Sequence, residues 1–173
     1  IEGVDRSNVF TVRNVTDIVN LKKFVTDCQI QDVAVVGGGF IGIEVAENLS
    51  MDGRHVSVIE AQDQIMAPFD YDMVQMLQKE LLDHGVDVIV NDGVSAIGEE
   101  SITLASGKEV KAGMTVLAIG AAPETGLAKA MGLELGETGA IKVDHNYRTS
   151  DPDIYAVGDA IEVFNRLTHK PSR

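Results

Sequence analysis

A short apolar run that ends in a cluster of glycines constrains the fold of this chain more than any other segment. The residues Val33–Val36 are typical of a buried parallel strand, and Gly37, Gly38 and Gly39 follow at once. With Gly42 they complete the spacing G-x-G-x-x-G. Apolar side chains then recur at helical spacing. The segment therefore predicts a strand, a tight glycine turn and a helix that begins at the turn.

The three glycines of this spacing each solve a different steric problem. Gly37 allows the tight turn, Gly39 lets a pyrophosphate approach the backbone, and Gly42 lets the helix lie close to the strand. Free backbone N–H groups and the positive end of the helix dipole would then face the phosphates. The pattern predicts a dinucleotide site. The alternative is a glycine-rich turn between a strand and a helix that binds no ligand.

An acidic residue stands where the ribose of a bound dinucleotide would lie. Val56–Ile59 is typical of the next strand, and Glu60 follows it at the expected interval of about 20 residues. A carboxylate accepts hydrogen bonds from both ribose hydroxyls and repels a 2′-phosphate, and Ala61, Gln62 and Asp63 bring no positive charge. We therefore expect NAD(H) in preference to NADP(H). An ordinary solvated loop carboxylate is the alternative interpretation of Glu60.

The overall charge limits the partners of this chain. Its 173 residues carry a formal net charge of −13, with a pI of about 4.5, which argues against nucleic acid or an anionic membrane as a partner. No apolar run approaches the ~20 residues of a membrane span, and the first residues show no signal-peptide pattern. The single cysteine fits a reducing compartment. We expect a cytoplasmic protein, and we expect no metal site because no ligand spacing is present.

Helix and strand patterns alternate along the chain. Three short segments suit a small antiparallel meander, namely Gly93–Gly98, Ser101–Ala105 and Glu109–Lys111. Strands are also expected at Val9–Val12, Val86–Val90, Met114–Gly120 and Ala140–Val143, and helices from Asn14 or Thr16 to Cys28, after Asp70 and at Gly126–Met131. This alternation predicts an α/β, Rossmann-like domain with a parallel sheet, helices on both faces and the inserted β-meander.

Two helices have a predicted buried face. In the first, the expected core residues are Ile18, Leu21, Phe24 and Val25. In the helix after Asp70, the stripe formed by Met73, Met76, Leu77 and Leu81 is interpreted as core and not as a methionine-rich binding surface. We expect His84 and Gly85 to end this helix, with His84 as a capping residue.

A second pattern lies near the end of the sequence, at Ile154–Ala160, where a short apolar stretch precedes Gly-Asp-Ala. By itself this pattern is equally typical of a simple strand and turn. Together with Gly37–Glu44, Glu60 and Ala118–Pro123, it resembles the flavoprotein pyridine nucleotide–disulfide oxidoreductase family. The resemblance implies a Rossmann-like FAD/NAD(P)-binding fold.

Two softer patterns, Ile65–Asp70 and Ile161–Val163, are most similar to the coenzyme A-disulfide reductase, NADH oxidase and persulfide reductase branch of this family. The resemblance implies that Glu44 lies near the nicotinamide and the flavin. It also implies that Asp159 hydrogen-bonds the ribityl or diphosphate part of FAD. The predicted cofactor-binding residues are Gly37, Gly38, Gly39, Phe40, Ile41, Gly42, Glu44, Glu60, Ala61, Ile119, Gly120 and Asp159.

The resemblance further implies a piece of a longer enzyme. We expect residues 1–29 to lead from an FAD domain, residues 30–148 to form the NAD(H)-binding domain, and residues 149–173 to return to the FAD domain. No catalytic residue is expected here, because the redox cysteine of the family would precede Ile1 and Cys28 does not occupy its position.

In the intact protein, expected to be a homodimer, hydride would pass from NADH to FAD, and electrons then to a disulfide, a persulfide or oxygen. The chain alone is expected to be inactive. Two alternatives remain open: a flavin-independent Rossmann dehydrogenase, and a non-enzymatic module that senses NADH.

Overall fold

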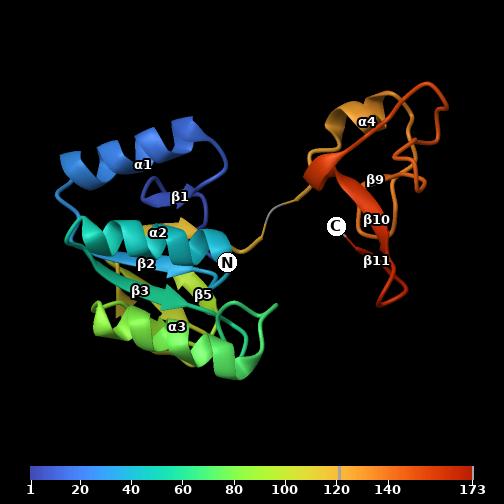
Figure 1. Cartoon of the computed structure of the whole chain (residues 1–173). Helices are drawn as coiled ribbons and strands as arrows, with labels where there is room; N and C mark the ends of the chain where they lie inside the picture. The colour runs from blue at the N-terminus through green and yellow to red at the C-terminus, as the bar shows by residue number, and fades with distance from the viewer. Residues whose placement is uncertain (121, 173) are drawn as a thin grey trace. The chain divides into compact units, whose positions relative to one another are not determined.

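The computed structural model describes residues 1–120 and 122–172. The chain folds as two compact units, Ile1–Gly120 and Ala121–Arg173. Figure 1 shows the elements of each unit, which are described separately below. The predicted division of the chain into three parts concerns the domains of a longer protein, and it stays a prediction.

The first unit is built on a five-stranded sheet. Its strands are β1 (Val9–Thr11), β2 (Asp32–Val36), β3 (His55–Ile59), β4 (Asp87–Ile89) and β8 (Met114–Leu117), in the order β1-β8-β2-β3-β4. Every neighbouring pair is parallel. The central strand β2 is almost wholly buried, as its run of valines requires. The predicted Rossmann-like parallel sheet is confirmed.

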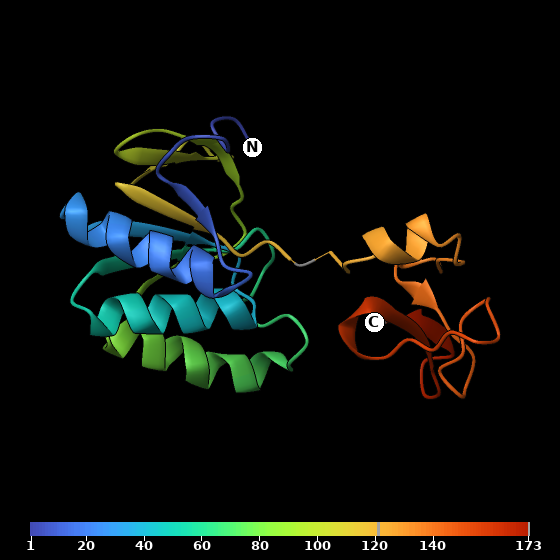
Figure 2. The same cartoon turned by 90° about the horizontal axis from the view of Figure 1, so that it is seen from above.

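Three helices pack on one face of this sheet: α1 (Val15–Asp27), α2 (Phe40–Met51) and α3 (Tyr71–Asp83). Side chains alternate across a strand, so Val33 and Val35 of β2 and Val56 and Val58 of β3 point to the same side. All four lie in one core cluster with buried residues of the three helices. Figure 2 shows the helices together on one side of the sheet.

The opposite face is covered by a second, smaller sheet. Strands β5 (Val94–Ile97), β6 (Ser101–Leu104) and β7 (Glu109–Lys111) pair antiparallel in that order, which confirms the predicted meander. Its buried side chains form a separate cluster with Ala34 and Ile59 of the large sheet. The expectation of helices on both faces is therefore wrong, because the apolar side of the meander fills the face that a helix would occupy.

The faces of two helices also differ from the prediction. In α1, Leu21 and Val25 are buried as expected, whereas Ile18 is 50% exposed. In α3, Met73 and Met76 are 53% and 64% exposed. The buried positions of α3 are Val74 and Leu81. These two residues lie seven apart, so they define the line that faces the sheet, and the two methionines fall beside it.

The helix ends follow the sequence signals more closely. Asn14 is the N-cap of α1, and its side-chain oxygen accepts a hydrogen bond from the Asp17 N–H at 3.1 Å. His84 is the C-cap of α3, its Nδ1 lies 2.9 Å from the Glu80 carbonyl oxygen, and Gly85 follows with φ +75°. Of the two N-cap candidates, Asn14 and Thr16, Asn14 caps α1, and the predicted capping role of His84 is confirmed.

The second unit has its own small core. It contains α4 (Gly126–Ala130), β9 (Ile141–Lys142), a 3-10 turn at Gly158–Ala160, β10 (Ile161–Asn165) and β11 (Lys170–Ser172). β10 lies between β9, to which it is parallel, and β11, to which it is antiparallel. Ala128, Ile141 and Ile161 are the buried residues of its core. Within the described residues of the chain, no helix is both long and apolar enough to cross a membrane.

Candidate functional site

The predicted site lies at the carboxyl ends of β2 and β8. Val36 is in register with Leu117, and the Ala118 N–H donates to the Val36 carbonyl oxygen at 2.7 Å. From β2 the chain continues to β3 on one side, whereas β8 and β1 lie on the other. The gap outside the carboxyl ends of two such strands is the place where open α/β sheets bind ligands.

Two glycines of the turn are required by close approaches of the backbone. Gly37 has φ +106°, and a Cβ added there would lie 2.5 Å from the Ala118 carbonyl oxygen. A Cβ added at Gly42 would lie 1.9 Å from the Gly37 carbonyl oxygen. Both distances are far below van der Waals contact, so the turn and the first turn of α2 need glycine at these positions.

The third glycine of the pattern faces open space. Gly39 is the N-cap of α2 with φ −81°, and a Cβ added there would meet nothing within 4 Å. The first bond of the helix runs from the Ile43 N–H to the Gly39 carbonyl oxygen at 3.0 Å. The N–H groups of the preceding helical residues, Phe40 to Gly42, therefore lack an intrahelical partner. An open surface beside such N–H groups suits a phosphate.

The remaining glycine of the cluster, Gly38, packs against the segment that follows Glu60. A Cβ added at Gly38 would lie 2.6 Å from Ile65 Cγ2, and Ile65 is fully buried. The Met66 N–H donates to the Gly38 carbonyl oxygen at 2.7 Å. This packing role lies outside the G-x-G-x-x-G rule, and the signal for it in the sequence is the apolar run Ile65–Phe69, which follows the polar residues 62–64.

Glu60 leaves the end of β3 and reaches the glycine turn. Its Oε2 accepts a hydrogen bond from the Gly38 N–H at 2.8 Å, and its Oε1 accepts one from the Gln62 N–H at 2.9 Å. The side chain is half-buried. Ala61 is exposed beside it, and a Cβ added at Gly93 would lie 3.6 Å from the Ala61 Cβ. The fold thus brings the predicted acid and the predicted phosphate-binding turn together.

Apolar side chains border the turn. Phe40 is exposed, and its ring meets that of Phe69 edge-on with centroids 5.9 Å apart. Ile119 is 63% exposed, and its nitrogen lies 3.2 Å from the Cβ that a side chain at Gly37 would have. Gly120 follows with φ +105°. An exposed apolar rim next to open amides suits a ligand that has both rings and phosphates.

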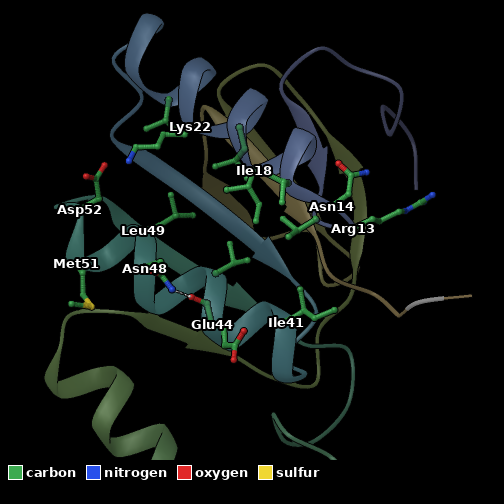
Figure 3. Close-up of a pocket in the computed structure, with 15 residues that line it drawn as sticks. Arg13, Asn14, Ile18, Lys22, Ile41, Glu44, Asn48, Leu49, Met51 and Asp52 are labelled. Atoms are coloured by element: carbon green, nitrogen blue, oxygen red, sulfur yellow. Dashed lines mark hydrogen bonds between the residues drawn. The ribbon is translucent and has the colours of Figure 1, made fainter. Parts of the chain in front are cut away.

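Ile41 and Glu44 line a groove between α1 and α2 with a volume of about 860 Å³. Figure 3 shows Ile18 of α1 on one side of this groove, and Ile41 and Glu44 of α2 on the other. The Asn48 side-chain amide donates to the Glu44 carbonyl oxygen at 2.8 Å, while the Glu44 carboxylate is exposed. This groove was not predicted from the sequence, and its presence accounts for the exposure of Ile18.

Asp159 belongs to the second unit. It is exposed in the 3-10 turn Gly158–Ala160, which begins at Gly158 with φ +80°. All other predicted site residues lie in the first unit, Ile1–Gly120. Together, Gly37–Gly42, Glu60 and Ile119–Gly120 form one continuous candidate site, which can hold an anionic ligand at backbone amides and a hydroxyl-bearing ligand at a carboxylate.

The comparison with known proteins agrees with this architecture. The model of the pyridine nucleotide-disulphide oxidoreductase family matches residues 1–171. The chain belongs to this family. Its curated relatives include enzymes named NADH oxidase, coenzyme A disulfide reductase and NAD(P)H coenzyme A polysulfide/persulfide reductase, which confirms the predicted branch.

Individual relatives show how much of the enzyme is present. The NADH oxidase of Methanocaldococcus jannaschii is 37% identical over 97% of this chain and 38% of its own length. The reduced CoADR-RHD of Bacillus anthracis is 40% identical with a TM-score of 0.94, over 99% of this chain and 31% of that one. The water-forming NADH oxidase of Lactobacillus brevis is 29% identical with a TM-score of 0.86, over 99% and 38%. The chain thus spans less than half the length of these relatives.

Proposed function

We propose that the first unit binds NADH and is the NADH-binding domain of an FAD-dependent oxidoreductase. The observation that carries this proposal is the distance of 2.8 Å between the Glu60 carboxylate and the Gly38 N–H. It places the only acid that the dinucleotide pattern requires directly beside the amides that the pattern offers to phosphates. A glycine turn that binds no ligand would not need the open space that lies beside Gly39 and the unpaired N–H groups after it.

The residues of the chain divide the work of binding. The N–H groups of Phe40 to Gly42 and the positive end of the α2 dipole receive the pyrophosphate, and the open space at Gly39 admits it. The Glu60 carboxylate accepts hydrogen bonds from the ribose hydroxyls, because each of its oxygens has a second lone pair beyond the one that a backbone N–H occupies. Ile119 and Gly120 border the nucleotide on the side of β8.

The charge around Glu60 supports NADH over NADPH. Glu60 is followed by Ala61, Gln62 and Asp63, so a 2′-phosphate would meet two carboxylates and no cation in this segment. The L. brevis enzyme was solved with NADH bound. Its engineered NADPH-bound form replaces one aspartate with alanine and introduces two arginines. That exchange follows the same electrostatic rule.

The cofactor FAD is assigned to the longer enzyme. When both are bound, NADH supplies a hydride and FAD accepts it. We infer that Glu44 lies on the nicotinamide side of α2 and that Asp159 contributes an acceptor to the hydroxyl-bearing part of FAD. The full enzyme, as a homodimer, would then reduce a disulfide, a persulfide or oxygen.

Titration of the purified chain with NADH, NADPH and FAD tests the proposal. We expect NADH to bind at least about tenfold more tightly than NADPH, and FAD to bind weakly or not at all. In amide NMR spectra, NADH should shift signals of residues 37–44, 60–62 and 119–120, while signals of α4 stay in place and serve as the internal control. Equal affinity for NADPH would contradict the nucleotide assignment. NMR shifts confined to other residues would show that NADH does not bind at the proposed site.

A further inference from the structure

Both oxygens of the Glu60 carboxylate are engaged by the protein itself. One accepts the Gly38 N–H at 2.8 Å and the other accepts the Gln62 N–H at 2.9 Å. Gly38 lies 22 residues away in the sequence, so the Glu60–Gly38 hydrogen bond joins the end of β3 to the glycine turn. We call this hydrogen bond the tie. A side chain whose only task was to meet a ribose would not need to reach back to the turn.

The peptide groups around Gly38 are held from both sides by the same segment. Glu60 holds the Gly38 N–H, and the Met66 N–H holds the Gly38 carbonyl oxygen at 2.7 Å. Ile65, between these two contacts in the sequence, is buried against Gly38. Glycine has little conformational preference of its own. The conformation of the turn at Gly38 is therefore imposed by its partners in residues 60–66.

The strength of the tie at the N–H depends on the charge of Glu60. Hydrogen bonds to an ionised carboxylate are shorter and about twice as strong as neutral ones. Gly38 is buried, so its N–H has no ready replacement from bulk water if the carboxylate is removed. The next residue, Gly39, is the N-cap of α2 with open space beside it, and it precedes the row of N–H groups at Phe40 to Gly42 that have no intrahelical partner. A shift of the Gly38 peptide would change the direction of that row.

We propose that Glu60 is a positioning residue for the glycine turn as well as the ligand of the ribose. It fixes the orientation of the Gly38 peptide, and this peptide in turn sets the direction of the N–H groups that receive the pyrophosphate. The effect on nucleotide affinity rests on the proposed function, whereas the tie itself exists in the ligand-free protein. Removal of the acid alone should therefore loosen the phosphate site and should not convert it into an NADPH site.

Amide exchange in the whole 173-residue chain without ligand tests the tie. Three variants are compared with the parent: Glu60→Ala, Glu60→Gln, and Asp63→Asn as the matched control. Asp63 is an exposed acid of the same loop, and in this ligand-free exchange measurement it controls for the loss of one negative charge near the turn. We expect Glu60→Ala to speed exchange of the Gly38 amide at least about tenfold and to move its proton signal upfield. In Glu60→Gln, the exchange rate of the Gly38 amide should lie between those of the parent and of Glu60→Ala, because the Gln side-chain oxygen still accepts one hydrogen bond.

The control variant should leave the Gly38 amide unchanged. Unchanged exchange and chemical shift of Gly38 in both Glu60 variants would overturn the proposal. Should Glu60→Ala fail to fold, Glu60→Gln, which keeps the shape and removes the charge, decides alone. These readouts need no nucleotide, so they remain decisive even if the chain proves not to bind NADH, which would refute only the proposed function.

Titrations of the same variants test the consequence for binding. We expect Glu60→Ala to weaken NADH at least about tenfold and to leave NADPH no tighter than in the parent chain. An Ala variant that binds NADPH as tightly as the parent binds NADH would overturn the positioning role, because the turn would then be intact without the acid.

Discussion

The Gly37 carbonyl oxygen lies 1.9 Å from the position that a Cβ on Gly42 would take. The carbonyl group of Gly37, the first residue of the glycine turn, thus occupies space that any larger residue at position 42, in the first turn of α2, would need. The obstacle is backbone and not a flexible side chain, so it cannot be relieved by a change of rotamer. Close packing of the helix end on the strand end is what puts the helix dipole at the site.

Gly42→Ala is expected to lower the free energy of unfolding by about 1–3 kcal/mol, because the helix must move away from Gly37 to admit the methyl group. Urea denaturation followed by circular dichroism measures it. Gly39→Ala is the matched control: with φ −81° and nothing within 4 Å, it should cost less than about 1 kcal/mol, from the weaker N-cap that Ala makes. Equal losses in the two variants would contradict the packing argument.

Gly39→Val is expected to remove NADH binding while the fold is retained. The branched side chain would fill the open space in which the pyrophosphate is proposed to lie, and no protein atom stands there to be displaced. Fluorescence titration with NADH, with the far-ultraviolet spectrum as a check of folding, gives the answer. Unchanged affinity in a folded variant would rule out a phosphate at this turn.

Two helix caps are expected to differ in strength. Asn14→Ala should cost about 1 kcal/mol, because the Asn14 side chain accepts a hydrogen bond from the Asp17 N–H. Asp70 is the N-cap of α3 by position, but its side chain makes no capping bond. Asp70→Ala should therefore cost less than half as much in thermal or urea unfolding. A larger loss at Asp70 would mean that its carboxylate does cap α3 in solution.

The exposed methionines of α3 should matter little to stability. Met76→Ala removes a side chain that is 64% exposed and should change the free energy of unfolding by less than about 0.5 kcal/mol. Val74→Ala, which creates a cavity at a residue that is 2% exposed, should cost about 1–3 kcal/mol. Urea denaturation measures both losses. A larger loss for Met76→Ala than for Val74→Ala would mean that the methionine stripe is the core face of α3.

An ion pair at the start of β2 should make stability depend on pH. The Lys111 ammonium donates to the Asp32 carboxylate at 2.9 Å and lowers the pKa of Asp32 below 3.8, with a smaller contribution from His55. The folded state thus favours ionised Asp32, so the stabilisation is present above pH 3.8 and is lost as the pH falls through the lowered pKa.

Lys111→Met should therefore melt a few degrees below the parent chain near neutral pH, and the gap should narrow below pH 3.8. The effect is small because Lys111 is largely exposed. Thermal melts of both proteins across this range provide the measurement. A gap that stays constant to the lowest accessible pH would show that the loss comes from packing of the lysine stem and not from the ion pair.

Much of this fold could be predicted because its signals are local. The valines of β2, the glycine spacing, the Asn14 cap and the turn signals of the meander each involve residues close together in the sequence. The parallel sheet, the meander and the helix after Gly39 were predicted on this basis and are confirmed. The steric demands at Gly37 and Gly42 likewise follow from the spacing, because the pattern has its first glycine at the tight turn and its third at the close contact between helix and strand.

The predictions from sequence are wrong where the covering of a surface depends on segments that are far apart in the sequence. Whether a helix or the meander covers the second face of the sheet depends on packing against Ala34 and Ile59, and periodicity within a helix does not report that. The same holds for Met76, whose apolar character predicted burial although it lies off the line through Val74 and Leu81. Ile18 lies on the same face of α1 as Leu21 and Val25 but lines the groove between α1 and α2, so it is exposed. An apolar residue can be exposed at little cost, so composition alone cannot place it.

The sequence by itself determined that a strand, a glycine bend and a helix would follow one another, and that an acid would stand at the end of the next strand. Only the tertiary structure decided that this acid accepts a hydrogen bond from the Gly38 N–H, and that Ile65 packs against the same glycine while the Met66 N–H donates to its carbonyl oxygen. The reason is physical: steric rules act between neighbours along the chain, whereas a hydrogen bond across 22 residues exists only after the sheet has brought its partners together.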